Sequence, residues 1–287
     1  MPSFTTPTPV SATIQLPCGA IRIEASERDD TVVEVTPSNS ARDRDIAAAA
    51  QTRVDFADGT LRVIAPKGQG GGILRKSGSV DVVVALPAGS IVDARTGLGQ
   101  VLLVGSIGDA RVRTGAGDVQ VQDATSVDLV TGLGAISAGH VIGKATCTTG
   151  SGSVRLSYVD GSAQIKNSNG DTWLGGVSGV LKAKSSNGSI RVDRAGADVK
   201  ASTANGDVHV GSTERGTVDL RTALGSIEVG IADGVAARLD LHTSFGAVRS
   251  ELDATDRPSP TDGTVTVSAQ TSAGDITIRR APAPAAA

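Results

Sequence analysis

The side chains best suited to chemistry in this chain are three histidines and a series of regularly spaced aspartates. His140, His209 and His242 lie far apart, and none has the Glu-x-x-His or Cys-x-x-Cys neighbours that indicate a metal site. A calcium-binding β-roll needs Gly-Gly-x-Gly-x-Asp in nine-residue units, whereas the aspartates here directly follow single glycines at twice that spacing. These aspartates are Asp118, Asp171, Asp207 and Asp275. We therefore expect no metal site, cofactor or catalytic residue.

Carboxylates on one outer face could serve a polysaccharide-acting enzyme, which works with paired acids. Asp93, Asp128 and Asp219 are predicted to point outward, but they alternate with basic residues such as Arg111 and Lys200. That arrangement balances charge, and no pair of carboxylates stands apart from it. We expect a protein that is not an enzyme, with a polysaccharide-acting enzyme as an alternative.

One group of basic residues surrounds the single tryptophan and forms a candidate partner-binding patch. Its members are Trp173, Arg155, Arg191, Lys166 and Lys184. An aromatic ring flanked by cations can anchor a protein or an anionic glycan. The alternative is that the lysines are only solvated and the tryptophan lies flat on the protein surface.

The elements that position these side chains follow from a repeat of about 18 residues. Thr, Ser or Asn stands three residues before each repeat glycine, and a β-branched residue stands two residues after it. A fixed period of this kind is typical of a solenoid, in which each repeat forms one coil. The repeat glycines are Gly99, Gly117, Gly134, Gly152, Gly170, Gly188, Gly206, Gly225, Gly246 and Gly274.

Apolar residues alternate with polar ones on both sides of each repeat glycine, which predicts two half-buried strands per coil. The Gly-x-Gly or Asn-Gly links between them suit sharp corners, although Asn-Gly also occurs in antiparallel hairpins. We favour the corner, because stacking explains the constant period. The predicted fold is all-β: a right-handed parallel β-helix, or β-solenoid, with a triangular or flattened cross-section.

The predicted organisation has four parts. Residues 1–10 form a flexible N-terminus, 11–89 form capping strands with one short inserted helix, 90–280 form the solenoid repeats, and 281–287 form a disordered tail. The helix is predicted from Ile46 to Gln51, with a cap near Ser40–Asp43. The long step between Gly246 and Gly274 is predicted to hold a surface excursion of the last coil, near residues 253–263.

Composition limits the function further. The chain has 36 glycines, only five aromatic residues and a net charge of −3, so we expect no nucleic acid partner. No apolar run is long enough to span a membrane, and residues 1–9 lack the features of a secretory signal. Cys18 and Cys147 are expected to be reduced thiols. Together these features predict a cytoplasmic protein, with surface location only by a non-classical route.

The repeats resemble a bacterial "putative adhesin" family of β-strand-repeat proteins of unknown function, in its actinobacterial branch. The segments Ile165–Trp173 and Thr203–Val208 carry the resemblance, together with the strand block that ends at Val82–Gly89. The resemblance covers roughly residues 10–280 and implies a β-helical fold without established catalytic residues.

The function expected from the sequence is a non-enzymatic interaction scaffold that binds a macromolecule through its outer faces. A self-assembling, filament-forming structural protein is the alternative from another class. The two differ at the ends of the solenoid, because caps would block end-to-end stacking.

Overall fold

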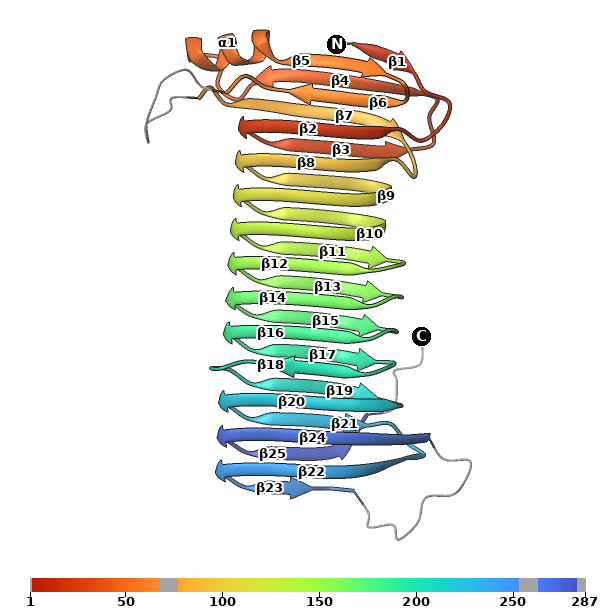
Figure 1. Ribbon diagram of the computed structural model, residues 1–287, viewed down its shortest axis with the longest axis vertical. Helices are drawn as coiled ribbons and strands as arrows, with labels where there is room; N and C mark the ends of the chain where they lie inside the picture. The colour runs from red at the N-terminus through yellow and green to blue at the C-terminus, as the bar shows by residue number, and fades with distance from the viewer. Residues whose placement is uncertain (1, 68–76, 253–262, 283–287) are drawn as a thin grey trace. The chain divides into compact units, whose positions relative to one another are not determined.

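The computed structural model describes residues 2–67, 77–252 and 263–282. The chain divides into two compact units, unit 1 (Met1–Ile142) and unit 2 (Gly143–Ala287). Each unit consists mainly of parallel strands wound into stacked coils, which confirms the predicted parallel β-helix (Figure 1). The expected excursion near 253–263 and the tail from 283 onward lie outside the described residues, apart from Gly263.

Each regular coil contributes one strand before its repeat glycine, in the first sheet, and one strand after it, in the second sheet. The described residues show no third separate strand per coil. In unit 1 the elements are β1 (Ser3–Thr5), β2 (Ser11–Cys18), β3 (Ile21–Ser26), β4 (Asp30–Pro37), α1 (Asp43–Gln51), β5 (Arg53–Ala57), β6 (Thr60–Ile64), β7 (Val80–Pro87), β8 (Ile91–Leu98), β9 (Val101–Ala116), β10 (Val119–Leu133) and β11 (Ile136–Val141).

Unit 1 is not stacked in chain order. The coil β2–β3 lies between the coil β6–β7 on one side and β8 with the first half of β9 on the other. β9 and β10 each pass from the second sheet into the first without a break. Beyond β6 and β7, the antiparallel strands β5 and β4 close this end of the unit.

The cap of unit 1 is built from side chains that the repeats lack. Phe4 in β1 stacks on Phe56 in β5 with ring centres 5.1 Å apart. Strand β1 lies within residues 1–10, the segment expected to be flexible, and pairs with β4. The predicted helix is confirmed as α1, but its N-cap residue is Arg42 and no side chain caps it. Asp45 of α1 is instead buried, where its carboxylate accepts a hydrogen bond from the Ser79 N–H at 3.0 Å.

Unit 2 has the same coil design in a longer regular run. In its first sheet the strands lie in the order β12 (Ala145–Ser151), β14 (Ala163–Asn169), β16 (Leu181–Asn187), β18 (Val199–Ser202), β20 (Gly216–Leu224), β24 (Gly263–Ala273) and β22 (Val235–Phe245). In its second sheet the order is β13 (Val154–Val159), β15 (Thr172–Val177), β17 (Ile190–Ala195), β19 (Val208–Thr213), β21 (Ile227–Ile231), β25 (Ile276–Arg280) and β23 (Val248–Ser250).

The last coil in the sequence is not the last coil in the stack. β24 and β25 lie between β20–β21 on one side and β22–β23 on the other, as Figure 1 shows. The long step between Gly246 and Gly274 therefore leads the chain back into an inner layer, which the sequence interpretation did not foresee.

The repeat glycines form the corners between the two sheets. Their φ angles lie between 126° and 155°, a range that side chains other than glycine rarely adopt. The N–H of eight of these ten glycines also donates to a carbonyl of an adjoining coil, as from Gly117 to Leu133 at 2.8 Å. A Cβ on Gly117 would overlap the carbonyl oxygen of Gly99. The Asn-Gly corners belong to parallel strands, so the hairpin alternative is wrong.

Thr or Asn residues before the corners support the same turns, whereas the buried hydroxyl of Ser185, at the Gly188 corner, has no hydrogen-bond partner among the described residues. The Thr131 hydroxyl donates to the Gly117 carbonyl at 3.0 Å, and the Thr203 hydroxyl donates to Gly188 at 3.0 Å. In the coil at Gly170, the Asn167 amide donates to both Gly152 and Gly170. These side chains satisfy backbone carbonyls and are not free to bind a ligand.

Substitution of a corner glycine tests the stacking directly. We expect Gly117→Ala to destabilise the protein much more than Gly59→Ala, because only the former adds a clash with the preceding coil. Gly59 also has positive φ, 68°, but no atom lies within 4 Å of a Cβ placed there. Replacing Gly59 with Ala should lower the free energy of unfolding by only about 1–2 kcal/mol, the energy needed to hold alanine in the left-handed conformation. Urea titrations measure both; equal costs would contradict the role of the corner.

Inward positions should be equally sensitive. Leu129 and Ile165 are 0 % and 1 % exposed, and the narrow interior cannot collapse around a cavity. Replacing either with Ala should lower the free energy of unfolding by about 2–5 kcal/mol. Asp128→Ala is the outward control and should cost less than about 1 kcal/mol, because its pairs with Arg111 and Arg113 are exposed. Similar losses in all three variants would show that the two faces are misassigned.

Candidate functional site

Three of the five predicted patch residues lie together on the second sheet of unit 2. Arg155, Trp173 and Arg191 occupy equivalent positions on the neighbouring strands β13, β15 and β17. The Arg155 guanidinium carbon lies 5.1 Å from the centre of the Trp173 ring, a cation–π geometry. The Trp173 indole N–H donates to Asp193 at 3.0 Å, and Arg191 donates to the other oxygen of Asp193 at 2.9 Å.

The tryptophan is half-buried rather than fully exposed. Its ring lies beside Gly175, where a Cβ would come within 3.1 Å of the ring. The Cη2–Cζ2 edge of the ring therefore lies next to Gly175 of the same strand, and Arg155 lies over the ring. The ring serves to hold Arg155 and Asp193 in place and is not a bare platform for a ligand.

Lys166 and Lys184 lie elsewhere. They are neighbours on β14 and β16 of the first sheet, because they precede their repeat glycines while the other three residues follow theirs. The corner thus separates the five residues into two clusters, one on each sheet. The binding role of either cluster stays a prediction.

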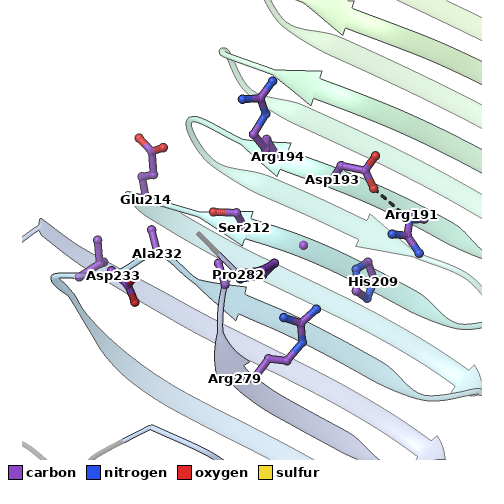
Figure 2. A pocket seen from close by; sticks show the side chains of 13 residues that line it. Arg191, Asp193, Arg194, His209, Ser212, Glu214, Ala232, Asp233, Arg279 and Pro282 are labelled. Atoms are coloured by element: carbon purple, nitrogen blue, oxygen red, sulfur yellow. Dashed lines mark hydrogen bonds and ion pairs between the residues drawn. The ribbon is translucent and has the colours of Figure 1, made fainter. Parts of the chain in front are cut away.

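A groove of about 780 Å³ continues from Arg191 along the second sheet of unit 2. We call it the arginine groove, because Arg191, Arg194 and Arg279 project around it from β17 and β25, as Figure 2 shows. It is lined by Arg191, Asp193, Arg194, His209, Gly211, Ser212, Glu214, Ala232, Asp233, Val235, Arg279, Ala281 and Pro282.

An outward glycine, Gly211, lines this groove. Gly211 follows Asp193 in the stack of strands and Gly230 follows Gly211, so two successive coils lack a side chain there. At the end of β25, the Ala281 N–H donates to the Ile231 carbonyl at 2.8 Å and continues the ladder with β21, and Ala281 lies beside the outward side of Gly230. The sequence interpretation missed this site, although glycines at two successive outward positions of the repeat could have indicated it.

Two of the three groove arginines have acidic partners. Arg191 pairs with Asp193, and Arg279 donates to Glu228, which also lies 3.2 Å from His209 Nδ1. The hydrogen bond from Arg279 holds the pKa of Glu228 below its ordinary value; burial opposes this shift, and nearby His209 adds to it. Arg194 has no hydrogen-bond or ion-pair partner among the residues that the structure describes, and so remains available.

A smaller hollow of about 240 Å³ adjoins the groove and shares Arg194, Ser212 and Glu214 with it. Tyr158 lies at this hollow with its ring over Gly176, and its hydroxyl is 3.1 Å from the Ser178 hydroxyl. The tryptophan cluster, the groove and this hollow form one continuous strip along the second sheet of unit 2.

The regularly spaced aspartates that the sequence analysis considered as metal ligands have structural roles. Asp118, Asp171, Asp207 and Asp275 each accept a backbone N–H from the adjoining coil, at 2.8–2.9 Å. The Ala247 N–H, followed by Arg249, holds the pKa of Asp275 below its ordinary value. Within residues 2–67, 77–252 and 263–282, no cluster of three His, Cys, Asp or Glu side chains could hold a metal ion. Cys18 and Cys147 form no disulfide bond among the described residues.

The stacked coils and the outer groove define a β-solenoid with a surface site. Sequence comparison identifies the family. Residues 13–279 match the model of Toastrack DUF4097, and the chain belongs to that family. The predicted actinobacterial branch stays a prediction. No curated protein matches the sequence. Over its described length, no helix of the protein is long and apolar enough to cross a membrane.

Three solved structures can be aligned over nearly the whole chain. A putative adhesin from Bacteroides fragilis is 13% identical, with 96% of this chain and 95% of that chain covered and a TM-score of 0.37. A putative adhesin from Parabacteroides distasonis is 12% identical, with coverages of 97% and 95% and a TM-score of 0.34. A putative cell adhesion protein from Clostridium sporogenes is 10% identical, with coverages of 97% and 98% and a TM-score of 0.20. Similarities this low assign no function.

The ion pairs around Glu228 predict a pH dependence of stability. The pKa of Glu228 is lower in the folded protein than its ordinary value of 4.5. The ionised Glu228 side chain therefore stabilises the folded state above pH 4.5, and this stabilisation is lost as the pH falls below 4.5. The difference in melting temperature between the natural protein and Glu228→Gln should therefore shrink between pH 6 and about pH 3. Calorimetry across this range measures it, and a constant difference would contradict the assignment.

Proposed function

We propose that this protein is a non-enzymatic interaction module that binds an extended, carboxylate-bearing polymer in the arginine groove. The observation that carries the proposal is Arg194, a cation without a counter-ion among the described residues, in a groove that two further arginines line. A free guanidinium offers several N–H donors in a plane, which matches a carboxylate in two-point hydrogen bonding.

The shape of the site favours a polymer over a small molecule. The strip crosses successive strands from β13 to β25, and neighbouring strands of a sheet lie about 4.8 Å apart. A chain of linked acidic units could therefore meet Arg155, Arg194 and Arg279 in turn. An anionic glycan and an acidic protein segment share this chemistry, and the choice between them is left to experiment.

The charges in the groove support a binding role over catalysis. A general acid in glycoside hydrolysis needs a carboxyl whose pKa is raised. Glu228, which does not line the groove but pairs with its Arg279, instead has a lowered pKa. Asp193, which does line the groove, is occupied by Arg191 and the Trp173 indole. Filament formation has less support, because antiparallel β4 and β5 cover the end coil of unit 1. The predicted cytoplasmic location stays a prediction.

Binding to polygalacturonate and to polyglutamate tests the proposal. Arg194→Ala should weaken binding of the preferred polymer about tenfold or more, since a hydrogen bond to a charged group contributes about 1.5–3 kcal/mol. Lys182→Ala is the matched control: Lys182 is an exposed cation on the first sheet of the same unit and should have little effect. Affinity should also fall with added salt. Equal effects of the two substitutions, or no binding of either polymer, would contradict the proposal.

A further inference from the structure

The coil β22–β23 ends unit 2 without closing its interior. Leu239 and Leu241 of β22 are partly exposed, although the equivalent Val218 and Leu220 of β20 are 0 % exposed. On β23, Val248 is 46 % exposed, although the equivalent Ile276 of β25 is 0 % exposed. The apolar positions that every inner coil buries are thus left half-covered in this one.

The backbone at this end is also open. β22 pairs with β24 on one side and β23 pairs with β25, but no described strand lies along their other edges. A long apolar edge with unpaired N–H and C=O groups favours pairing with another strand. The neighbouring residues 253–262, which lie outside the described part of the chain, have the sequence DATDRPSPTD and include no large apolar side chain.

We propose that a second copy of this chain docks on this edge, with the two β22 strands antiparallel across a two-fold axis. An axis normal to the sheets stacks each sheet on its counterpart and reverses the strand direction. The same surface then serves both copies, as a two-fold interface requires. The partly exposed leucines of the two end coils would complete one shared apolar interior.

The outward charges of β22 select a register for this pairing. With Leu239 on the axis, Arg238 lies opposite Asp240 of the partner subunit, and this pair occurs twice. Moving the axis to Arg238 or to Asp240 places like charges opposite each other, which destabilises a sheet. Moving it to Leu241 leaves Arg238 opposite Ser244 of the partner subunit, without a counter-charge.

The association should stop at two copies. At the other chain end, unit 1 does not present an open parallel coil, because β6 and β7 are already paired with the antiparallel strands β5 and β4. The free edge of β22 is fully paired in the two-fold contact. A closed dimer follows, rather than a filament.

Sedimentation of the full chain tests the interface. The expected species at about 100 μM is a dimer, with twice the 28.7 kDa mass of one chain. Asp240→Arg should weaken the dimer about tenfold or more, since it opposes Arg238 with a second arginine. The double variant Arg238→Asp with Asp240→Arg should restore it. Lys182→Glu, an outward charge reversal within an inner coil, should leave the dimer intact.

Two further measurements distinguish a second copy of the chain from other segments that could cover the edge of β22. Melting curves should show that Asp240→Arg stays folded, because Asp240 is exposed. Replacing residues 253–262 with Gly and Ser at equal length should preserve the dimer. A monomer at about 100 μM, a larger assembly, insensitivity to Asp240→Arg, or failure of the double variant to restore dimers would overturn the proposal.

Discussion

The structure depends on one close approach, which occurs wherever a repeat glycine meets the carbonyl of the repeat glycine in the preceding coil. The positive φ turns the chain by a corner, and the absence of a Cβ lets neighbouring corners lie in direct backbone contact. The hydroxyls of Thr131 and Thr203 then satisfy the carbonyls that the corner leaves free. Because every corner is held in the same place, the strands on both sides keep a constant register.

Constant register turns sequence spacing into surface geometry. Residues at the same distance from the repeat glycine come to lie beside each other on adjacent strands, as Arg155, Trp173 and Arg191 do. A glycine at an outward position, such as Gly211, makes a hollow instead of a projection. The same rule that fills the interior with Val, Ile, Leu and Ala therefore also shapes the groove outside.

Much of this could be predicted from the sequence, because period, alternation and corner residues are local signals that repeat many times. The parallel coils, the buried faces of Leu129 and Ile165, and the structural role of Thr131 follow from them. The arginine groove could be predicted only in part: its outward Gly211 is visible in the repeat, but its far wall depends on where Ala281 and Pro282 lie after β25. The position of β24–β25 was also hidden, because periodicity gives the spacing of coils and not the order in which they stack.

That stacking order gives unit 2 an unusual mechanical end. If the coils followed chain order, a force on the C-terminal segment would peel away an outermost layer, one backbone hydrogen bond at a time. Here β24 and β25 are held by strands on both sides. A pull on Arg280 must first separate Arg279 and Arg280 from β21, and then separate residues 276–278 from β21 and β23 together. The inner position of β25 therefore adds a second ladder to its resistance against fraying.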